Sequence, residues 1–196
     1  MIRFSFSRSL AICFTCTLLF IFSTLTGCKD MSPSINLAPN HPKLLKLKLT
    51  QFLELAQSSE KQVELQNELG KSLLTAPQVA SLLREHPQRQ AWSQFYEEKL
   101  AKQARTELLW TLQEAVKLGY SQLEVSRIGP HAGSTNAHGD LALLEMLKSR
   151  DGLFTIRLKR NESDKQALRI SGWLYQQDLG WVTLLKLGEE ILQYSK

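Results

Sequence analysis

The chain has 196 residues, with 24 basic and 19 acidic side chains and a formal charge of +5. Arg3, Arg8 and all three cysteines lie within the first 28 positions, so the rest carries 22 basic and 19 acidic residues and no thiol. This excess of +3 is too small to predict nucleic-acid binding. Beyond position 28, disulfides, a cysteine nucleophile and a cysteine metal site are excluded.

Residues 1–27 have the parts of a secretory signal peptide. Arg3 and Arg8 form a basic start, and Leu10–Leu25 is an apolar core without charge. The following residues, Leu25-Thr26-Gly27-Cys28, resemble the lipobox of bacterial lipoproteins.

The lipobox resemblance implies cleavage before Cys28, with diacylglycerol thioether-linked to Cys28 and an N-acyl chain on its amino group. This covalent lipid is the only cofactor that we expect. The next residue is Lys29, whereas Asp at that place tends to retain such proteins in the inner membrane of diderm bacteria. The resemblance therefore implies an outer-membrane lipoprotein facing the periplasm. The alternative is an uncleaved anchor, because the 19 uncharged residues Ser9–Gly27 could just span a bilayer.

Residues 28–42 are predicted to be the lipidated cysteine and a flexible tether. The segment contains Pro33, Pro39 and Pro42 and has no apolar period. As a flexible chain it would span about 20 Å on average. Residues 43–196 are enough for one globular domain with a single core.

Amphipathic helices are predicted from Lys43 onward. One apolar stripe of helical spacing comprises Leu45, Leu49, Phe52, Leu53 and Ala56. The alternation over Leu45–Leu49 also fits a short strand. Residues 60–73 continue the helical pattern with Val63, Leu65, Leu69 and Leu73.

The lysines near the tether are open to two interpretations. Lys43, Lys46 and Lys48 could contact anionic lipid head groups, or they could be an ordinary solvated helix face.

Two further helices have recognisable ends. Thr75 and Gln78 form a predicted capping box for a helix that stops before Pro87. A long helix is predicted over Gln88–Leu118, with Gly119 as its C-terminal cap. Its buried stripe comprises Trp92, Phe95, Tyr96, Leu100, Ala104, Leu108, Leu112, Ala115 and Val116.

The second half of the chain favours strands. In order, we expect a strand over Gln122–Ile128, a short helix over Asp140–Lys148, strands over Leu153–Arg160, Ala167–Tyr175 and Trp181–Leu187, and a helical turn over Glu189–Tyr194. Along the second strand, alternation places Phe154, Ile156 and Leu158 inward and Thr155, Arg157 and Lys159 outward. The connections are too short for parallel crossovers. The predicted fold class is therefore α+β, with N-terminal helices packed against a C-terminal, curved antiparallel meander of about four strands.

The element order over Gln88–Leu187, with Gly172-Trp173-Leu174-Tyr175 and Gly180-Trp181, resembles the nuclear-transport-factor-like and cystatin-like cone folds. The resemblance implies a curved sheet wrapped around helices. It brings no active-site motif with it, and fold likeness alone does not identify a reaction.

The loop of residues 129–140 gathers His131, His138 and Asp140. These side chains could bind a divalent metal or do acid–base work, although their spacing matches no standard metal motif. The alternative is a surface connection rich in turn formers, with Asp140 capping the next helix.

A basic face on the meander is the second candidate site. It comprises Arg157, Lys159, Arg169, Trp173 and Tyr175, on the expectation that Trp173 and Tyr175 share a face with Arg169. Arginine beside aromatic rings can bind a protein partner or an anionic glycan. The alternative is a solvated sheet face.

Two functions of different classes follow. The first is a lipid-anchored cell-envelope protein with a non-catalytic domain that binds an envelope protein, a polymer or an apolar ligand. The second is a periplasmic hydrolase or lyase that uses His131, His138 and Asp140.

Overall fold

A computed structural model describes residues 37–129, 138–149, 152–163 and 166–194. The predicted signal peptide, Cys28, most of the tether and His131 lie outside these residues. Within the described ranges, no helix combines the length and the apolar character needed to span a bilayer.

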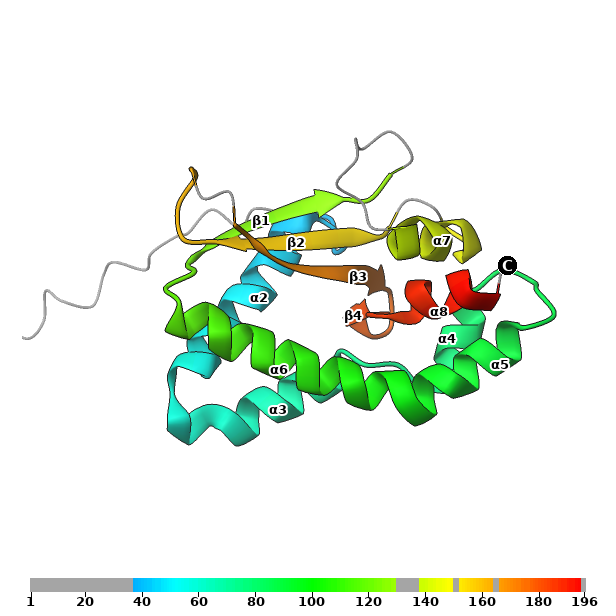
Figure 1. The fold of residues 1–196 in the computed structure, drawn as a ribbon, viewed down its shortest axis with the longest axis horizontal. Helices are drawn as coiled ribbons and strands as arrows, with labels where there is room; N and C mark the ends of the chain where they lie inside the picture. The colour runs from blue at the N-terminus through cyan, green and yellow to red at the C-terminus, as the bar shows by residue number, and fades with distance from the viewer. Residues whose placement is uncertain (1–36, 130–137, 150–151, 164–165, 195–196) are drawn as a thin grey trace, which may run out of the picture. The chain divides into compact units, whose positions relative to one another are not determined.

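The order of elements is that of an α+β domain, as predicted (Figure 1). A 3₁₀ turn at Ser59–Lys61 precedes α3, and a π-helical turn at Tyr96–Leu100 joins α5 to α6. The helices and strands are α2 (Pro42–Gln57), α3 (Gln62–Lys71), α4 (Ala76–Leu82), α5 (Arg89–Phe95), α6 (Ala101–Lys117), β1 (Gln122–Arg127), α7 (His138–Met146), β2 (Phe154–Lys159), β3 (Leu168–Gln176), β4 (Gly180–Thr183) and α8 (Leu187–Tyr194).

The four described strands form an antiparallel meander in the order β1-β2-β3-β4. Phe154, Ile156 and Leu158 are buried in one core, so the predicted inward face of β2 is confirmed. On β1, Leu123 pairs with Leu158 and Val125 with Ile156. The last strand is shorter than predicted. It ends at Thr183, and the chain then turns into α8, which begins at Leu187.

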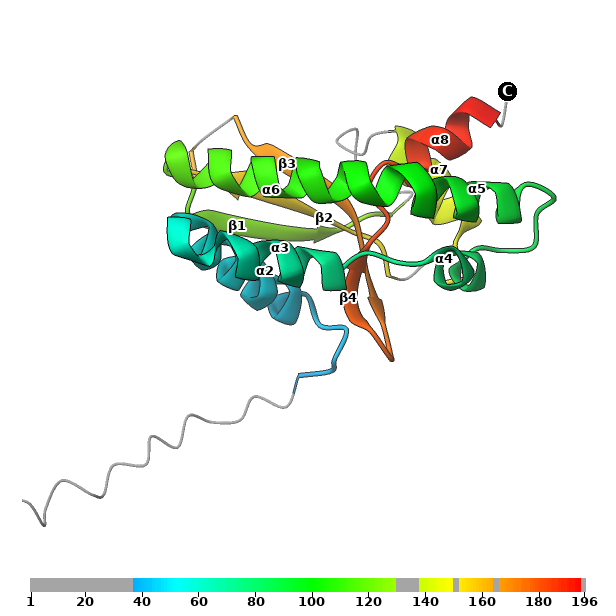
Figure 2. The same ribbon diagram turned by 90° about the horizontal axis from the view of Figure 1, so that it is seen from below.

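A first hydrophobic core lies between this sheet and the helices α2, α3 and α6 (Figure 2). All five residues of the predicted α2 stripe are buried, which confirms the helical interpretation of that segment over the strand alternative. Val63 is the exception in the next helix, because 70% of its side chain is exposed. It lies two positions before Leu65, about 200° around the helix axis from the buried side of α3.

A second hydrophobic core lies at the other end of the sheet. Here α4, the π turn, α7 and α8 pack together with Leu174 of β3 and Val182 of β4. The paired strands β3 and β4 therefore contribute to both cores, one from each face.

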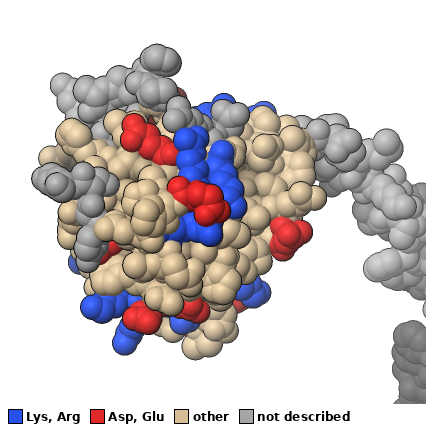
Figure 3. Space-filling model, turned by 90° about the vertical axis from the view of Figure 1, so that its right-hand side faces the viewer, with Lys and Arg blue, Asp and Glu red and all other residues tan. Residues whose placement is uncertain are grey.

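Over the end of the domain where α5 and α8 lie, basic and acidic side chains are neighbours (Figure 3). One such pair is Arg89 with Glu85.

The predicted helix ends are confirmed. At Gly119 the backbone φ is 72°, the Tyr120 N–H donates to the Ala115 carbonyl at 2.8 Å, and the Gly119 N–H donates to the Val116 carbonyl at 3.1 Å. This pair of bonds is a Schellman motif, which satisfies carbonyls that the helix end leaves without partners. At the start of α4, the Thr75 N–H donates to the Gln78 side-chain oxygen at 2.8 Å.

Tyr96 connects the long helical segment to the sheet. Its side chain is fully buried, and its hydroxyl donates to the Thr183 carbonyl at 2.6 Å. Burial raises the pKa of this phenol far above its ordinary value of 10.0. Tyr96 is the first residue of the π turn, so the widened turn sits where the helix meets the end of β4.

A β-bulge interrupts β3 and changes which residues share a face. Phe154 pairs with Trp173 and Ile156 with Ile170, so Ser171 and Gly172 both lie opposite the single residue Thr155. A bulge inserts one residue and reverses the alternation beyond it. Trp173 therefore points into the first core with Ile170, away from Arg169. The expectation that Trp173 and Tyr175 share a face with Arg169 is wrong for this reason.

The helices α7 and α8 approach so closely that their contact requires glycine. A Cβ placed on Gly188 would lie 1.9 Å from the Gly139 carbonyl oxygen, which no real side chain can do. A Cβ on Gly139 would lie 3.0 Å from the Glu189 backbone nitrogen. Backbone therefore packs directly on backbone at this crossing.

We predict that Gly188→Ala lowers the free energy of unfolding by more than about 2 kcal/mol, because the two helices would have to separate. Gly70→Ala is the matched control. It also replaces a helical glycine, but its new Cβ would meet only the end of Arg105 at 4.0 Å. This control should raise stability by about 0.5–1 kcal/mol. Chemical denaturation measures both, and equal midpoints for Gly188→Ala and the wild type would contradict the close packing.

Candidate functional site

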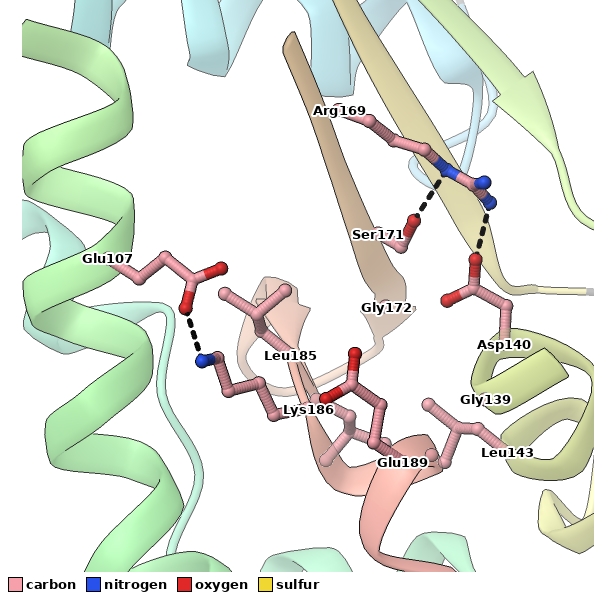
Figure 4. A pocket seen from close by; sticks show the side chains of 12 residues that line it. Glu107, Gly139, Asp140, Leu143, Arg169, Ser171, Gly172, Leu185, Lys186 and Glu189 are labelled. Atoms are coloured by element: carbon pink, nitrogen blue, oxygen red, sulfur yellow. Dashed lines mark hydrogen bonds and ion pairs between the residues drawn. The ribbon is translucent and has the colours of Figure 1, made fainter. Parts of the chain in front are cut away.

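A pocket of about 200 Å³ opens where α6, α7, β3 and the start of α8 meet (Figure 4). Its walls combine backbone at three glycines with side chains of both charges. The lining residues are Glu107, Gly139, Asp140, Leu143, Arg169, Ser171, Gly172, Leu184, Leu185, Lys186, Gly188 and Glu189.

One wall of the pocket is formed by an ion pair between Arg169 of β3 and Asp140 of α7. The guanidinium Nη2 lies 2.5 Å from the Asp140 Oδ2, and the side chains are only 27% and 11% exposed. The Arg169 Nε is 3.0 Å from both the Ser171 and the Thr155 hydroxyl oxygens. Thr155, expected to point to solvent, is thus buried beneath the arginine. Arg169 is held by three elements, so its orientation is fixed before any ligand arrives.

The position of Asp140 follows from local structure. It lies in the first turn of α7, where the partial positive charge of the helix N-terminus stabilises a carboxylate. Arg169 reaches it because the bulge leaves Arg169 and Ser171 on the α7 side of the sheet while Ile170 and Trp173 point into the first core.

The opposite wall carries a second ion pair. The Lys186 Nζ lies 2.7 Å from the Glu107 Oε2, and this hydrogen bond, with the negative charges of Glu107 and Glu189, raises the pKa of Lys186. The Lys186 backbone has a φ of 70°. A non-glycine residue in that region costs about 1–3 kcal/mol and persists only where its surroundings hold it. Between the two walls, the Glu189 side chain extends from α8 toward the pocket.

The charge of the lining limits what the pocket can bind. Three carboxylates, from Glu107, Asp140 and Glu189, face two cations, Arg169 and Lys186, which leaves one net negative charge. A small polar group that carries a positive charge matches this balance. The glycine backbone at positions 139, 172 and 188 lets such a group approach main-chain atoms closely.

The structure describes two residues of the histidine set proposed from the sequence, His138 and Asp140. Asp140 lies in the pocket wall, whereas His138 is the first residue of α7 and is exposed. His131 lies outside the described residues. Within the part of the chain that the structure describes, no three His, Cys, Asp or Glu side chains are grouped so that they could hold a metal ion.

The basic set is also divided. The Lys159 Nζ pairs with the Glu124 Oε2 at 2.5 Å, and this hydrogen bond lowers the pKa of Glu124. Trp173 is 0% exposed, so it cannot form part of a surface. Tyr175 is half-buried and meets the Trp181 ring edge-on, with 5.5 Å between ring centroids. Of this set, only Arg169 lines the pocket.

Arg157 stays beside Arg169 but does not reach the pocket. The two arginines are paired directly across β2 and β3. Like charges in this position repel each other, and the nearby Asp140 carboxylate offsets the charge of Arg169.

Sequence reasoning missed three pocket residues, Glu107, Lys186 and Glu189. Glu107 is one of several glutamates on an amphipathic helix, and nothing in its spacing distinguishes it from the others. The left-handed backbone at Lys186 depends on how β4 joins α8, and such conformations are typical of glycine and asparagine rather than lysine. No signal in the sequence could have identified these positions.

We predict that the Asp140–Arg169 pair stabilises the fold more than Lys186–Glu107 does. Asp140→Asn and Arg169→Met should each cost about 1–3 kcal/mol of unfolding free energy, because each removes the charge-assisted hydrogen bond between two largely buried side chains. In the matched cycle, Lys186→Met and Glu107→Gln should couple by less than about 1 kcal/mol, since those side chains are 33% and 42% exposed. Urea denaturation of the single and double variants gives both coupling energies; a larger coupling for Lys186–Glu107 would contradict this ranking.

No protein-family model, no curated protein and no solved structure matches the chain.

Proposed function

We propose that this chain is a lipid-anchored protein of the cell envelope whose globular domain is a non-catalytic binding module. The anchor is supported by the sequence Leu25-Thr26-Gly27-Cys28 at the end of an uncharged apolar run. In this proposal Cys28 carries the diacylglycerol and N-acyl lipid. Lys29 favours the outer membrane, with the domain in the periplasm and no nucleic-acid partner.

The observation that carries the binding role is the pocket between Asp140–Arg169 and Lys186–Glu107. Its charged side chains are positioned by contacts between separate elements, and its lining has one net negative charge. We propose that it accepts a positively charged amine, presented by a small molecule or by an envelope protein or polymer. Because the carboxylates are already oriented, little side-chain ordering opposes binding.

The enzymatic alternative, a hydrolase or lyase using His131, His138 and Asp140, has less support. A general base needs a carboxylate that can reach the substrate proton. The Asp140 Oδ2 is instead bound by the Arg169 guanidinium, and His138 is exposed at the start of α7. The resemblance to cone folds expected from the sequence over Gln88–Leu187 would be compatible with either role and favours neither.

The anchor is tested by intact mass. We expect the full-length protein, expressed in a diderm bacterium, to give a membrane-fraction product that begins at Cys28 and carries acyl mass. Cys28→Ala should abolish both cleavage at that position and the acyl mass. A wild-type product that retains residues 1–27 would mean a membrane-spanning anchor instead, and the inference from Lys29 would fall with it.

The pocket is tested with putrescine as the amine probe. Binding to the folded state alone raises the unfolding midpoint by mass action, so we expect a concentration-dependent rise for the wild type at constant ionic strength. Glu189→Gln should reduce this rise. Glu190→Gln is the matched control, because Glu190 is the next residue of α8 but does not line this pocket. No rise in the wild type, or equal loss in both variants, would refute an amine site here.

A further inference from the structure

The N-terminal half of α2 has an unbalanced charge. From Leu37 to Leu53 the chain carries three lysines and no acidic residue. The first turn of α2 contains no acid, and the partial positive charge of the helix N-terminus lies at the same end of α2 as these lysines. This differs from the end of the domain shown in Figure 3, where the two signs are neighbours.

Two of these lysines are presented to solvent and one is not. Lys43 and Lys46 are exposed on the outer side of α2. Lys48 turns inward, where its Nζ donates to the Trp181 carbonyl at 2.8 Å and lies 5.6 Å from the Phe52 ring centroid. Burial there lowers the pKa of Lys48. The surface formed by α2 therefore depends on Lys43 and Lys46 alone.

An exposed apolar side chain stands beside the two lysines. Leu47 is 58% exposed, one position after Lys46 and one helical turn after Lys43. It borders a hollow of about 650 Å³ between α2 and α3, into which Leu44 and Gln51 also face. Glu54, Glu64 and Glu68 line the same hollow, and α3 contributes the last two. Lys48 and Lys61 also line the hollow, and the acids disfavour contact of a negative surface with α3 and with the C-terminal turns of α2.

The length of chain between Cys28 and the first described residue limits how far this surface can lie from a lipid anchor. Only eight residues lie between Cys28 and Leu37, the first described position, which makes nine steps along the chain. Fully extended, they reach at most about 30 Å. A lipid on Cys28 would therefore keep Leu37, five positions before the start of α2 at Pro42, within that distance of the bilayer, so that α2 has a high effective concentration relative to the membrane. In Figure 2, α2 lies toward the lower side of the domain and α6 along the upper side.

We propose that Lys43, Lys46 and Leu47 form a docking surface for anionic phospholipid. The lysines contact head-group phosphates and Leu47 enters the interface, so that α2 sets the orientation of the domain on the membrane. Each contact is weak by itself and is effective because the anchor holds the domain near the surface. The docking rests on the proposed lipid anchor, and it specifies which face of the domain lies against the membrane.

The test places an environment-sensitive NBD fluorophore on the acylated protein. Cys13 and Cys16 leave with the signal peptide and Cys28 carries the lipid, so an introduced cysteine is the single labelled thiol. Gln51→Cys puts the probe one turn beyond Leu47, and Val63→Cys puts the control probe on an exposed site of α3. Vesicles contain either phosphatidylcholine alone or a 70:30 mixture with phosphatidylglycerol.

We expect a blue shift of the Gln51→Cys probe on the mixed vesicles, little shift on phosphatidylcholine, and none for Val63→Cys on either. Lys43→Glu with Lys46→Glu should abolish the shift. Lys102→Glu with Lys117→Glu, which changes the net charge equally on α6, should leave it intact. Raising the salt to about 0.5 M should weaken the shift by screening.

Two different failures are distinguishable. A protein that carries acyl mass and floats with the vesicles, but whose Gln51→Cys probe does not shift or shifts equally on both vesicle types, overturns the docking and leaves the anchor in place. An equal shift at Val63→Cys overturns the assignment to α2. A product without acyl mass overturns the anchor and the docking together.

Discussion

The bulge at Ser171 and Gly172 is the constraint on which the other features of the domain depend. It lets one strand serve two cores, with Ile170 and Trp173 on one side and Leu174 on the other. It also leaves Arg169 facing α7. A Cβ on Gly172 would lie 3.1 Å from the Leu184 backbone, so the same glycine brings β3 against the segment that leads into α8. If the same residues paired with regular alternation and no bulge, Trp173 would share the pocket side of the sheet with Arg169 instead of pointing into the first core.

The fold could be predicted where the signal is local. Thr75 and Gly119 mark helix ends because capping depends on only a few neighbouring residues, and the apolar stripe of α2 needs only the helical period. The prediction failed where tertiary contacts decide. A glycine such as Gly172 in a strand pattern is compatible with regular pairing, and its positive φ and its close approach to Leu184 arise only in the folded domain. Val63 has the same apolar character as Leu65 but lies on the exposed side of α3.

The candidate site was predictable only in fragments. The sequence predicts Asp140 and Arg169 as members of two separate candidate sites, Asp140 in a histidine-containing loop and Arg169 on a basic strand. Their meeting depends on a sheet register that period-two alternation does not encode. Lys186 itself has a left-handed backbone conformation after β4, and its side chain pairs with Glu107 of α6. A site assembled from α6, α7, β3 and the entry to α8 in this way has no contiguous motif, and its chemistry becomes visible only when the strand order and the bulge are known.

The glycine contact between α7 and α8 has a consequence for how this sequence can change over time. Side chains in the two cores can exchange one apolar residue for another, and surface charges can drift almost without restraint. Gly188 has no such freedom, because any replacement collides with the backbone at Gly139. Gly172 is restricted by its neighbour and by its φ of 82°. Distant relatives should therefore be recognisable less by overall sequence similarity than by three glycines, at the start of α7, within β3 and at the start of α8. These glycines would line the same pocket in chains whose other residues differ.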